Sequence, residues 1–259
     1  MNKSVTKHRR KLNSEQLEVL RLLYKFRFGS NDLFAQYFGK KDRSFVFKRL
    51  SILLEQSLVG KRFETSYRLA GKPAAYFLTP EGARTLQAND PKIEFNIKAI
   101  YKDKTVSEYF IKHCLAIFSV HNQLRAEYGD RLKFFTKSQL AKYDYFPEKL
   151  PDAYLRLGEK QFFLDIFHDD QPFFVAARRI KQYADYADDG EWDVTDTDLP
   201  TVLFICDSVS LQKLLQKRAA RSESDISFAL NTFAELSKGG AIWQQADEPE
   251  EPKKTLAEL

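Results

Sequence analysis

The stretch DRSFVFKRLSILLEQSLVGKRF, residues 42–63, contains the change of pattern on which the fold assignment depends. In its first half, Val46, Leu50 and Leu53 recur at the three-to-four-residue spacing that places side chains on one face of a helix. Further on the helical spacing ends, and residues 60–63 have the composition of a strand start. The stretch therefore predicts a helix that is followed directly by a β-hairpin.

The segments on either side of this stretch complete a known order of elements. A capping-box pattern at Asn13 predicts a helix over about 14–28, and a short second helix ends at Gly39. A partner strand follows over about 74–78, and a Thr-Pro pair then predicts a closing helix over about 80–87. Three helices, a hairpin and a closing helix form the order of a winged helix-turn-helix.

Basic residues are concentrated in this first part of the chain. The 259 residues together carry a net charge of +5, but residues 1–90 hold 18 Lys and Arg against 8 Asp and Glu, a net charge of +10. Winged helices bind DNA by placing a helix in the major groove and cations against the phosphates. We therefore expect duplex DNA to contact eight residues, which are Arg43, Ser44, Phe47, Lys48, Lys61, Arg62, Arg68 and Lys72. The alternative is a winged helix that binds another protein and has a solvated basic face.

The remainder of the chain predicts a mixed α/β domain. Helices are expected over about 105–128, 173–187, 208–221 and 225–237, and strands around 132–137, 152–157, 161–167 and 201–206. The fold class is then α+β. We expect four segments, which are a basic arm (1–12), a winged helix (13–90), the α/β domain (91–244) and a polar tail (245–259) too polar to be ordered.

Two aspartates in this second domain are candidates for chemistry. Asp165 lies inside the run FFLDIF, residues 162–167, where a carboxylate is costly unless it is paired, bound to a metal or turned to a cleft. Asp152 opens the preceding strand. Carboxylates on adjacent strands can share Mg²⁺, which could activate water or stabilise a phosphoryl transition state. The sequence predicts Asp152 and Asp165 as metal ligands and catalytic residues, with Mg²⁺ as the cofactor.

This order of elements resembles the PD-(D/E)xK nuclease superfamily, which has Pro-Asp on its second strand and a carboxylate-x-lysine triplet on its third. Pro151-Asp152 and Asp165-Ile-Phe167 occupy those places here. Phe167 cannot orient water or stabilise charge as the lysine would. The resemblance implies that Arg178, Arg179 or Lys181, on the following helix, could bring a cation back to the site, and Arg179 is the preferred candidate for a third catalytic residue.

The whole chain is similar to the replication-relaxation family of plasmid and mobile-element proteins, in which a winged helix precedes a nuclease-like domain. The resemblance is carried by Leu12–Leu17, Tyr76–Gly82, His113–Ile117 with Val120, Pro151–Ala153, Phe162–Asp165 and Arg179–Tyr183. The family usually has Glu at the position of Asp165 and Lys at that of Arg179. The resemblance implies DNA binding during plasmid replication, relaxation or mobilisation, with relaxase or replication proteins as partners.

Composition excludes several other classes of protein. Cys114 and Cys206 alone cannot form a disulfide framework or a zinc site, and no apolar run is long enough for a membrane span or a signal peptide. We therefore expect a cytoplasmic protein with no membrane partner. Three functions remain open: a DNA-binding initiator or accessory protein with a weakened nuclease-like domain, an active Mg²⁺-dependent endonuclease or nickase, and a transcriptional regulator whose α/β domain senses a ligand or dimerises. Symmetric DNA binding would suggest a homodimer.

Overall fold

The computed structural model describes residues 11–63, 67, 69, 71–239 and 242–259. The fold is mixed α+β, as the sequence predicts, and the chain divides into two units, Met1–Phe118 (unit 1) and Ser119–Leu259 (unit 2). The division falls inside the long helix α7 (Glu108–Tyr128). Within the described ranges, none of the helices is both long and apolar enough to cross a membrane.

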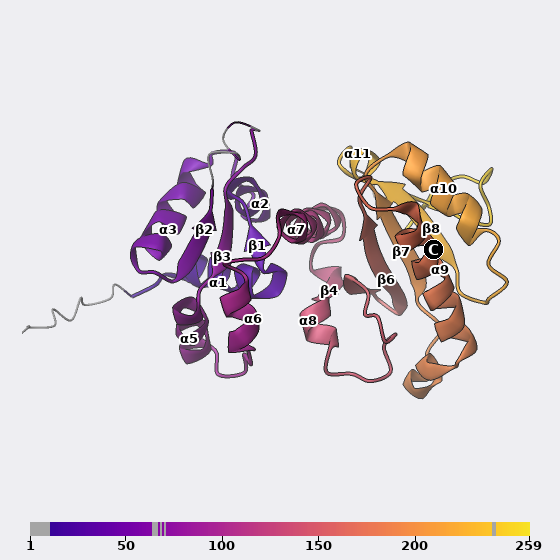
Figure 1. Cartoon of the computed structure of the whole chain (residues 1–259), viewed down its shortest axis with the longest axis horizontal. Coiled ribbons are helices and arrows are strands. Elements are labelled where there is room, and N and C mark those ends of the chain that lie inside the picture. Colours follow the sequence, from indigo (N-terminus) through magenta and orange to yellow (C-terminus); the bar gives the residue numbers. More distant parts are fainter. Residues whose placement is uncertain (1–10, 64–66, 68, 70, 240–241) are drawn as a thin grey trace, which may run out of the picture. The chain divides into compact units, whose positions relative to one another are not determined.

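Unit 1 packs helices around a small antiparallel sheet. Its elements are α1 (Ser14–Phe26), β1 (Phe28–Gly29), α2 (Asn31–Tyr37), α3 (Ser44–Glu55), β2 (Val59–Arg62), β3 (Ala75–Leu78), α5 (Pro80–Asn89), α6 (Ile97–Lys102) and the first part of α7. The strand order is β1-β3-β2, and Val59 lies opposite Leu78. Helix α1 contacts β3, and α3 contacts β2 (Figure 1).

Two local predictions for unit 1 are confirmed. The capping box is present, because the side chain of Asn13 accepts from the Gln16 amide at 2.8 Å and the side chain of Gln16 accepts from the Asn13 amide at 3.0 Å. In α3, the side chains of Val46, Leu50 and Leu53 are fully buried, so these residues form the predicted core face.

The end of α1 differs from the prediction. The helix ends at Phe26 instead of near residue 28, because Arg27 has a φ of 66°. Phe28 and Gly29 then pair with β3 as the short strand β1. A strand of two residues has no alternation of apolar and polar side chains, so its sequence gives no signal.

Unit 1 also extends beyond residue 90, where the sequence analysis places a domain boundary. Helix α6 and the first part of α7 belong to it. The guanidinium of Arg62 donates to the carbonyl oxygens of Lys104 and Val106, each at 3.1 Å. Ile111 and Cys114 of α7 lie in one buried cluster with aromatic residues of the sheet. These contacts depend on tertiary packing, which the local sequence around residue 90 does not report.

Unit 2 contains one seven-stranded sheet. Its elements after α7 are β4 (Leu132–Thr136), α8 (Lys137–Leu140), β5 (Ala153–Leu157), β6 (Lys160–Phe167), α9 (Phe173–Asp188), β7 (Thr201–Cys206), α10 (Val209–Ala219), β8 (Phe228–Thr232), α11 (Phe233–Leu236), β9 (Ile242–Gln245) and β10 (Lys254–Thr255), with single 3-10 turns at Gly129–Arg131 and Glu191–Thr195. The strand order is β10-β9-β8-β7-β6-β5-β4. Neighbouring strands are parallel across β6, β7 and β8 and antiparallel elsewhere.

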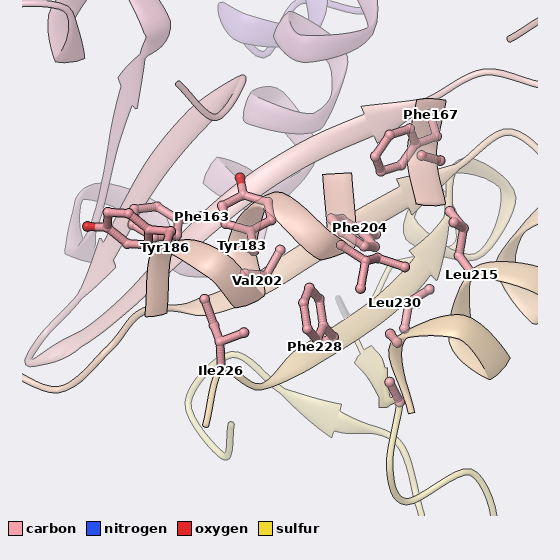
Figure 2. Packing of buried hydrophobic residues seen from close by; sticks show 14 of the residues in the cluster. Phe163, Phe167, Tyr183, Tyr186, Val202, Phe204, Leu215, Ile226, Phe228 and Leu230 are labelled. Atoms are coloured by element: carbon pink, nitrogen blue, oxygen red, sulfur yellow. The ribbon is translucent and has the colours of Figure 1, made fainter. Parts of the chain in front are cut away.

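The main core of unit 2 lies between this sheet and the helices α9 and α10. The sheet contributes Phe163, Phe204 and Phe228, while Tyr183 comes from α9 and Leu215 from α10 (Figure 2). The rings of Phe163 and Tyr183 are stacked with their centroids 5.6 Å apart. This packing fixes the position of α9 relative to β6, which carries one of the candidate catalytic residues.

Two features of the C-terminal region differ from the predictions. Residues 228–232 form the buried strand β8 instead of part of a helix, because they complete a parallel pair with β7. In the segment 245–259, expected to be disordered, β10 pairs with β9 and Leu256 is fully buried. The amide of Leu256 also donates to the hydroxyl of Tyr128 at 3.2 Å. Backbone pairing with β9 and burial of Leu256 therefore keep this polar segment ordered against the rest of unit 2.

Candidate functional site

The two candidate carboxylates lie side by side, with Asp152 immediately before β5 and Asp165 in β6. Strands β5 and β6 are antiparallel with Ala153 opposite Leu164, and this register brings Asp152 beside Asp165. The backbone amide of Asp152 donates to Oδ1 of Asp165 at 3.1 Å, and the amide of Ile166 donates to Oδ2 of Asp152 at 3.0 Å. Each carboxylate therefore accepts a hydrogen bond from a backbone amide of the neighbouring segment.

Arg179 brings a cation to the same place from α9. Its Nε donates to Oδ2 of Asp165 at 2.5 Å, and one terminal nitrogen donates to the carbonyl oxygen of Lys149 at 2.5 Å. The other terminal nitrogen donates to the hydroxyl of Tyr183 at 2.7 Å, and that hydroxyl donates to Oδ2 of Asp165 at 2.9 Å. The three side chains of Asp165, Arg179 and Tyr183 thus form one hydrogen-bonded cluster, which we call the buried triad.

The triad is closed to solvent. Asp165 is 6 % exposed, Arg179 2 % and Tyr183 0 %. Burial raises the pKa of the Asp165 carboxyl, and the neighbouring Arg179 guanidinium opposes that rise. Burial also raises the pKa of the Tyr183 hydroxyl well above its usual value, so Tyr183 remains a hydrogen-bond donor at neutral pH. The arrangement stabilises a charge pair inside the protein.

The donor set of the triad does not fit Mg²⁺ as it stands. Oδ2 of Asp165 accepts from two side-chain donors and Oδ1 from a backbone amide. A hard divalent ion prefers several oxygen ligands and retains waters, and it would have to displace the guanidinium from Oδ2. Across the described ranges, the structure contains no group of three or more His, Cys, Asp or Glu side chains arranged to hold a metal ion.

Phe167 is part of the hydrophobic core. Phe167 is 5 % exposed, and its ring lies edge-on to that of Phe204 with the centroids 5.0 Å apart (Figure 2). A charged side chain at this position would be desolvated without a partner, which costs several kcal/mol. The cation beside the Asp165 carboxylate is Arg179 of α9.

Sequence reasoning missed two members of this neighbourhood. Tyr183 follows Arg179 by four residues, a spacing that places both side chains on one face of a helix, and this was the available signal. Lys149 lies three residues before Asp152, and the pKa of its amine is lowered by burial and then by the charge of Arg179. No pattern in the sequence links the loop of Lys149 to α9.

In unit 1, one side of α3 carries the predicted DNA-contacting residues. Arg43, Ser44, Phe47 and Lys48 are all exposed, and the opposite side of the helix is buried. Nε of Arg43 donates to Oδ1 of Asp32 in α2 at 2.7 Å. This ion pair lies at the surface, because the Arg43 side chain is 72 % exposed.

The next basic residue, Arg49, points elsewhere. Its Nε donates to Glu15 of α1 at 2.7 Å, and its guanidinium stacks on the ring of Phe45 at 3.3 Å. Arg49 therefore joins α3 to α1, in agreement with its omission from the predicted DNA contacts.

The four predicted hairpin contacts differ from one another in environment. Lys61 is exposed, with its amine 4.9 Å from the centre of the Phe63 ring. Arg62 donates to backbone carbonyls beyond the hairpin, and Lys72 forms an ion pair with Glu108 at 3.3 Å. Arg68 lies outside the described residues. Lys61 is thus the described hairpin cation with the greatest access to a phosphate.

Comparison with protein families places most of the chain in a known family. A family model described as "Replication-relaxation" matches residues 20–202, a range that begins within α1 and ends within β7. No curated protein and no solved structure matches the chain. The matched range includes α3, the hairpin and all three residues of the buried triad.

Proposed function

Because the chain belongs to the replication-relaxation family, we propose that it binds duplex DNA through unit 1 during the replication, relaxation or mobilisation of a plasmid or mobile element. In this proposal, α3 enters the major groove as the recognition helix of a winged helix-turn-helix. Unit 2 is a nuclease-like module whose catalytic power is lost or weakened.

The exposed side of α3 is the observation that carries the DNA-binding part. Three helices, the β2–β3 hairpin and the closing helix α5 follow one another in the order of a winged helix. The outward side of α3 presents Arg43 and Lys48, and exposed Lys40 and Lys41 precede the helix. A helix with donors near its N-terminal end and cations on the same side suits the major groove and its flanking phosphates.

The buried triad supports the second part of the proposal. The order α7, β4, α8, β5, β6, α9 and β7 is similar to that expected of a PD-(D/E)xK nuclease core, and in this proposal Asp152 and Asp165 correspond to its two acids. Arg179, however, forms a buried ion pair with the carboxylate of Asp165. A guanidinium remains protonated and is a poor general base, so it cannot activate water as a lysine could.

A salt titration tests DNA binding. The full chain is mixed with a fluorescent duplex, and the binding constant is measured by anisotropy between about 50 and 300 mM salt. Each phosphate neutralised by the protein contributes about −0.9 to the slope of log K against log salt concentration. We expect a clear negative slope. Binding that does not weaken as salt rises would contradict docking on phosphates.

A cleavage assay tests the state of unit 2. Supercoiled plasmid is incubated with the protein and Mg²⁺ or Mn²⁺, and nicked and linear products are separated on a gel. We expect no cleavage by the natural sequence. Cleavage that disappears in Asp165→Ala, in a variant whose circular dichroism spectrum shows that it remains folded, would instead establish the alternative, an active metal-dependent endonuclease.

A further inference from the structure

One aromatic side chain projects from the exposed side of α3 into solvent. The ring of Phe47 is 56 % exposed, whereas the nearby ring of Phe45 packs against the guanidinium of Arg49. Phe47 is the fourth residue of α3 (Ser44–Glu55) and so lies in its N-terminal half. In recognition helices this half contacts the edges of bases. Exposed apolar area is unfavourable in water, and contact with an apolar group of a ligand would remove that cost.

The polar side chains next to Phe47 are already hydrogen-bonded within unit 1. Nε of Arg43 donates to Asp32 at 2.7 Å. The hydroxyl of Ser44 donates to the carboxylate of Asp42, which also accepts from the Ser44 amide at 2.7 Å. Ser44 therefore uses its only hydroxyl proton internally. Arg43, whose side chain is 72 % exposed, engages only its Nε in this pair and so keeps other donors for DNA, whereas the Phe47 ring offers apolar contact.

The surroundings of Phe47 indicate which partner covers it. Lys48 is its direct neighbour, and Lys40 and Lys41 are exposed just before the helix. An apolar ring among cations complements a ligand that is a polyanion with small apolar groups on its surface. Duplex DNA has this character, because the 5-methyl group of each thymine projects into the major groove between the phosphate backbones.

We infer that Phe47 contacts the 5-methyl group of a thymine and so gives the protein a preference for thymine at one position of its binding site. This inference rests on the proposed DNA binding by unit 1. Phenylalanine can contact this methyl group through apolar surface alone, with no hydrogen bond to the base. Lys48 then supplies affinity through a phosphate, and Phe47 supplies discrimination.

Replacement of single methyl groups tests the inference. Duplexes that the full chain selects from a random pool provide the binding site, and each thymine in turn is replaced by deoxyuridine, which lacks only the methyl group. Anisotropy at one fixed salt concentration gives the affinities. We expect one replacement to weaken binding by about 3- to 10-fold, the effect of removing one buried methyl group. Phe47→Ala should bind that thymine duplex and its deoxyuridine counterpart equally.

Two matched variants separate this role from general effects. Phe63→Ala removes a second exposed ring of unit 1, which is 45 % exposed, and should retain the discrimination. Lys48→Ala should weaken binding to both duplexes by the same factor. Two results would overturn the inference and leave salt-dependent binding intact. One is equal affinity of the natural protein for every thymine duplex and its deoxyuridine counterpart. The other is a Phe47→Ala variant that still binds the thymine duplex more tightly. A complete absence of DNA binding would overturn the proposed function as well.

Discussion

Nε of Arg179 and Oδ2 of Asp165 form an ion pair 2.5 Å apart inside unit 2, where both side chains are almost fully buried. The pair joins α9 to β6, and Tyr183 adds a hydrogen bond to the same carboxylate oxygen. Desolvated charges are tolerated in a protein only when each has its partner. The pair is therefore a structural element of unit 2 that joins α9 to β6.

Removal of the cation should destabilise unit 2 strongly. Arg179→Met leaves the Asp165 carboxylate buried without its countercharge, and we expect the free energy of unfolding to fall by about 3–5 kcal/mol. Urea denaturation followed by circular dichroism measures the change. The double variant Asp165→Asn with Arg179→Met removes both charges and should recover part of the loss. If Arg179→Met were as stable as the natural protein, the buried pair would not hold the fold.

The adjacent residues Lys48 and Arg49 of α3 should have different roles. Lys48 should affect DNA binding and not stability, whereas Arg49 should affect stability and not DNA binding. Lys48→Ala should weaken DNA binding and make the salt slope less negative by about 0.9, because one phosphate contact is lost. Its melting temperature should not change, since Lys48 is exposed.

Arg49→Ala is the matched control for this experiment. It removes the contacts of Arg49 with Glu15 and Phe45. It should lower the free energy of unfolding by about 1 kcal/mol and leave the salt slope unchanged. Equal losses of DNA affinity in the two variants would show that the contacts are not confined to the outward side of α3.

Sequence patterns predicted the elements whose signals are local. The capping box at Asn13 and the buried stripe of α3 depend on residues within one helix, and both are observed. The placement of Asp152 beside Asp165 followed from two adjacent strands. Residues 228–232 could not be assigned to a strand, because a short apolar run has no distinctive period and only pairing with β7 decides its structure. The four-residue spacing of Tyr183 from Arg179 could be seen in the sequence, but its contact with Asp165 could not, because that contact joins two segments far apart in the chain.

Tyr154 should make unfolding sensitive to alkaline pH. Burial raises the pKa of its hydroxyl to about 12, and the hydroxyl also donates to Gln161. An unfolded tyrosine has a pKa near 10, so between pH 10 and 12 the unfolded state loses its proton first and stability falls as pH rises. One such group contributes at most about 1.4 kcal/mol per pH unit. Urea denaturation at pH 8 to 11.5 should show a shallower decline for Tyr154→Phe, and identical declines would contradict the shift.

The thiol of Cys206 should be unreactive in the folded protein. Cys206 ends β7 with no exposed surface, and burial, with a smaller effect of Asp169 and Asp207, raises its pKa to about 12. Thiolates are the reactive form, and their fraction at pH 8 is then very small. In Cys114→Ala, which leaves Cys206 as the single cysteine, a disulfide reagent should label the protein only after urea unfolds it. Rapid labelling without urea would show that the end of β7 opens readily.

At Gly82, near the start of α5, two opposing effects decide whether substitution by Ala raises or lowers the free energy of unfolding. A Cβ atom at this position would lie 2.0 Å from the carbonyl oxygen of Leu58, an oxygen that also accepts from the hydroxyl of Thr79 at 2.9 Å. In an exposed helix position, Ala is about 1 kcal/mol more favourable than Gly. Here the backbone contact should outweigh that preference, so Gly82→Ala should lower the free energy of unfolding by about 1–3 kcal/mol or more. Ala88→Gly, at an exposed position of the same helix, should lower it by about 1 kcal/mol through propensity alone. Stabilisation by Gly82→Ala in thermal denaturation would mean that α5 can move away from Leu58, and that the closing helix is not held tightly against the first strand of the hairpin.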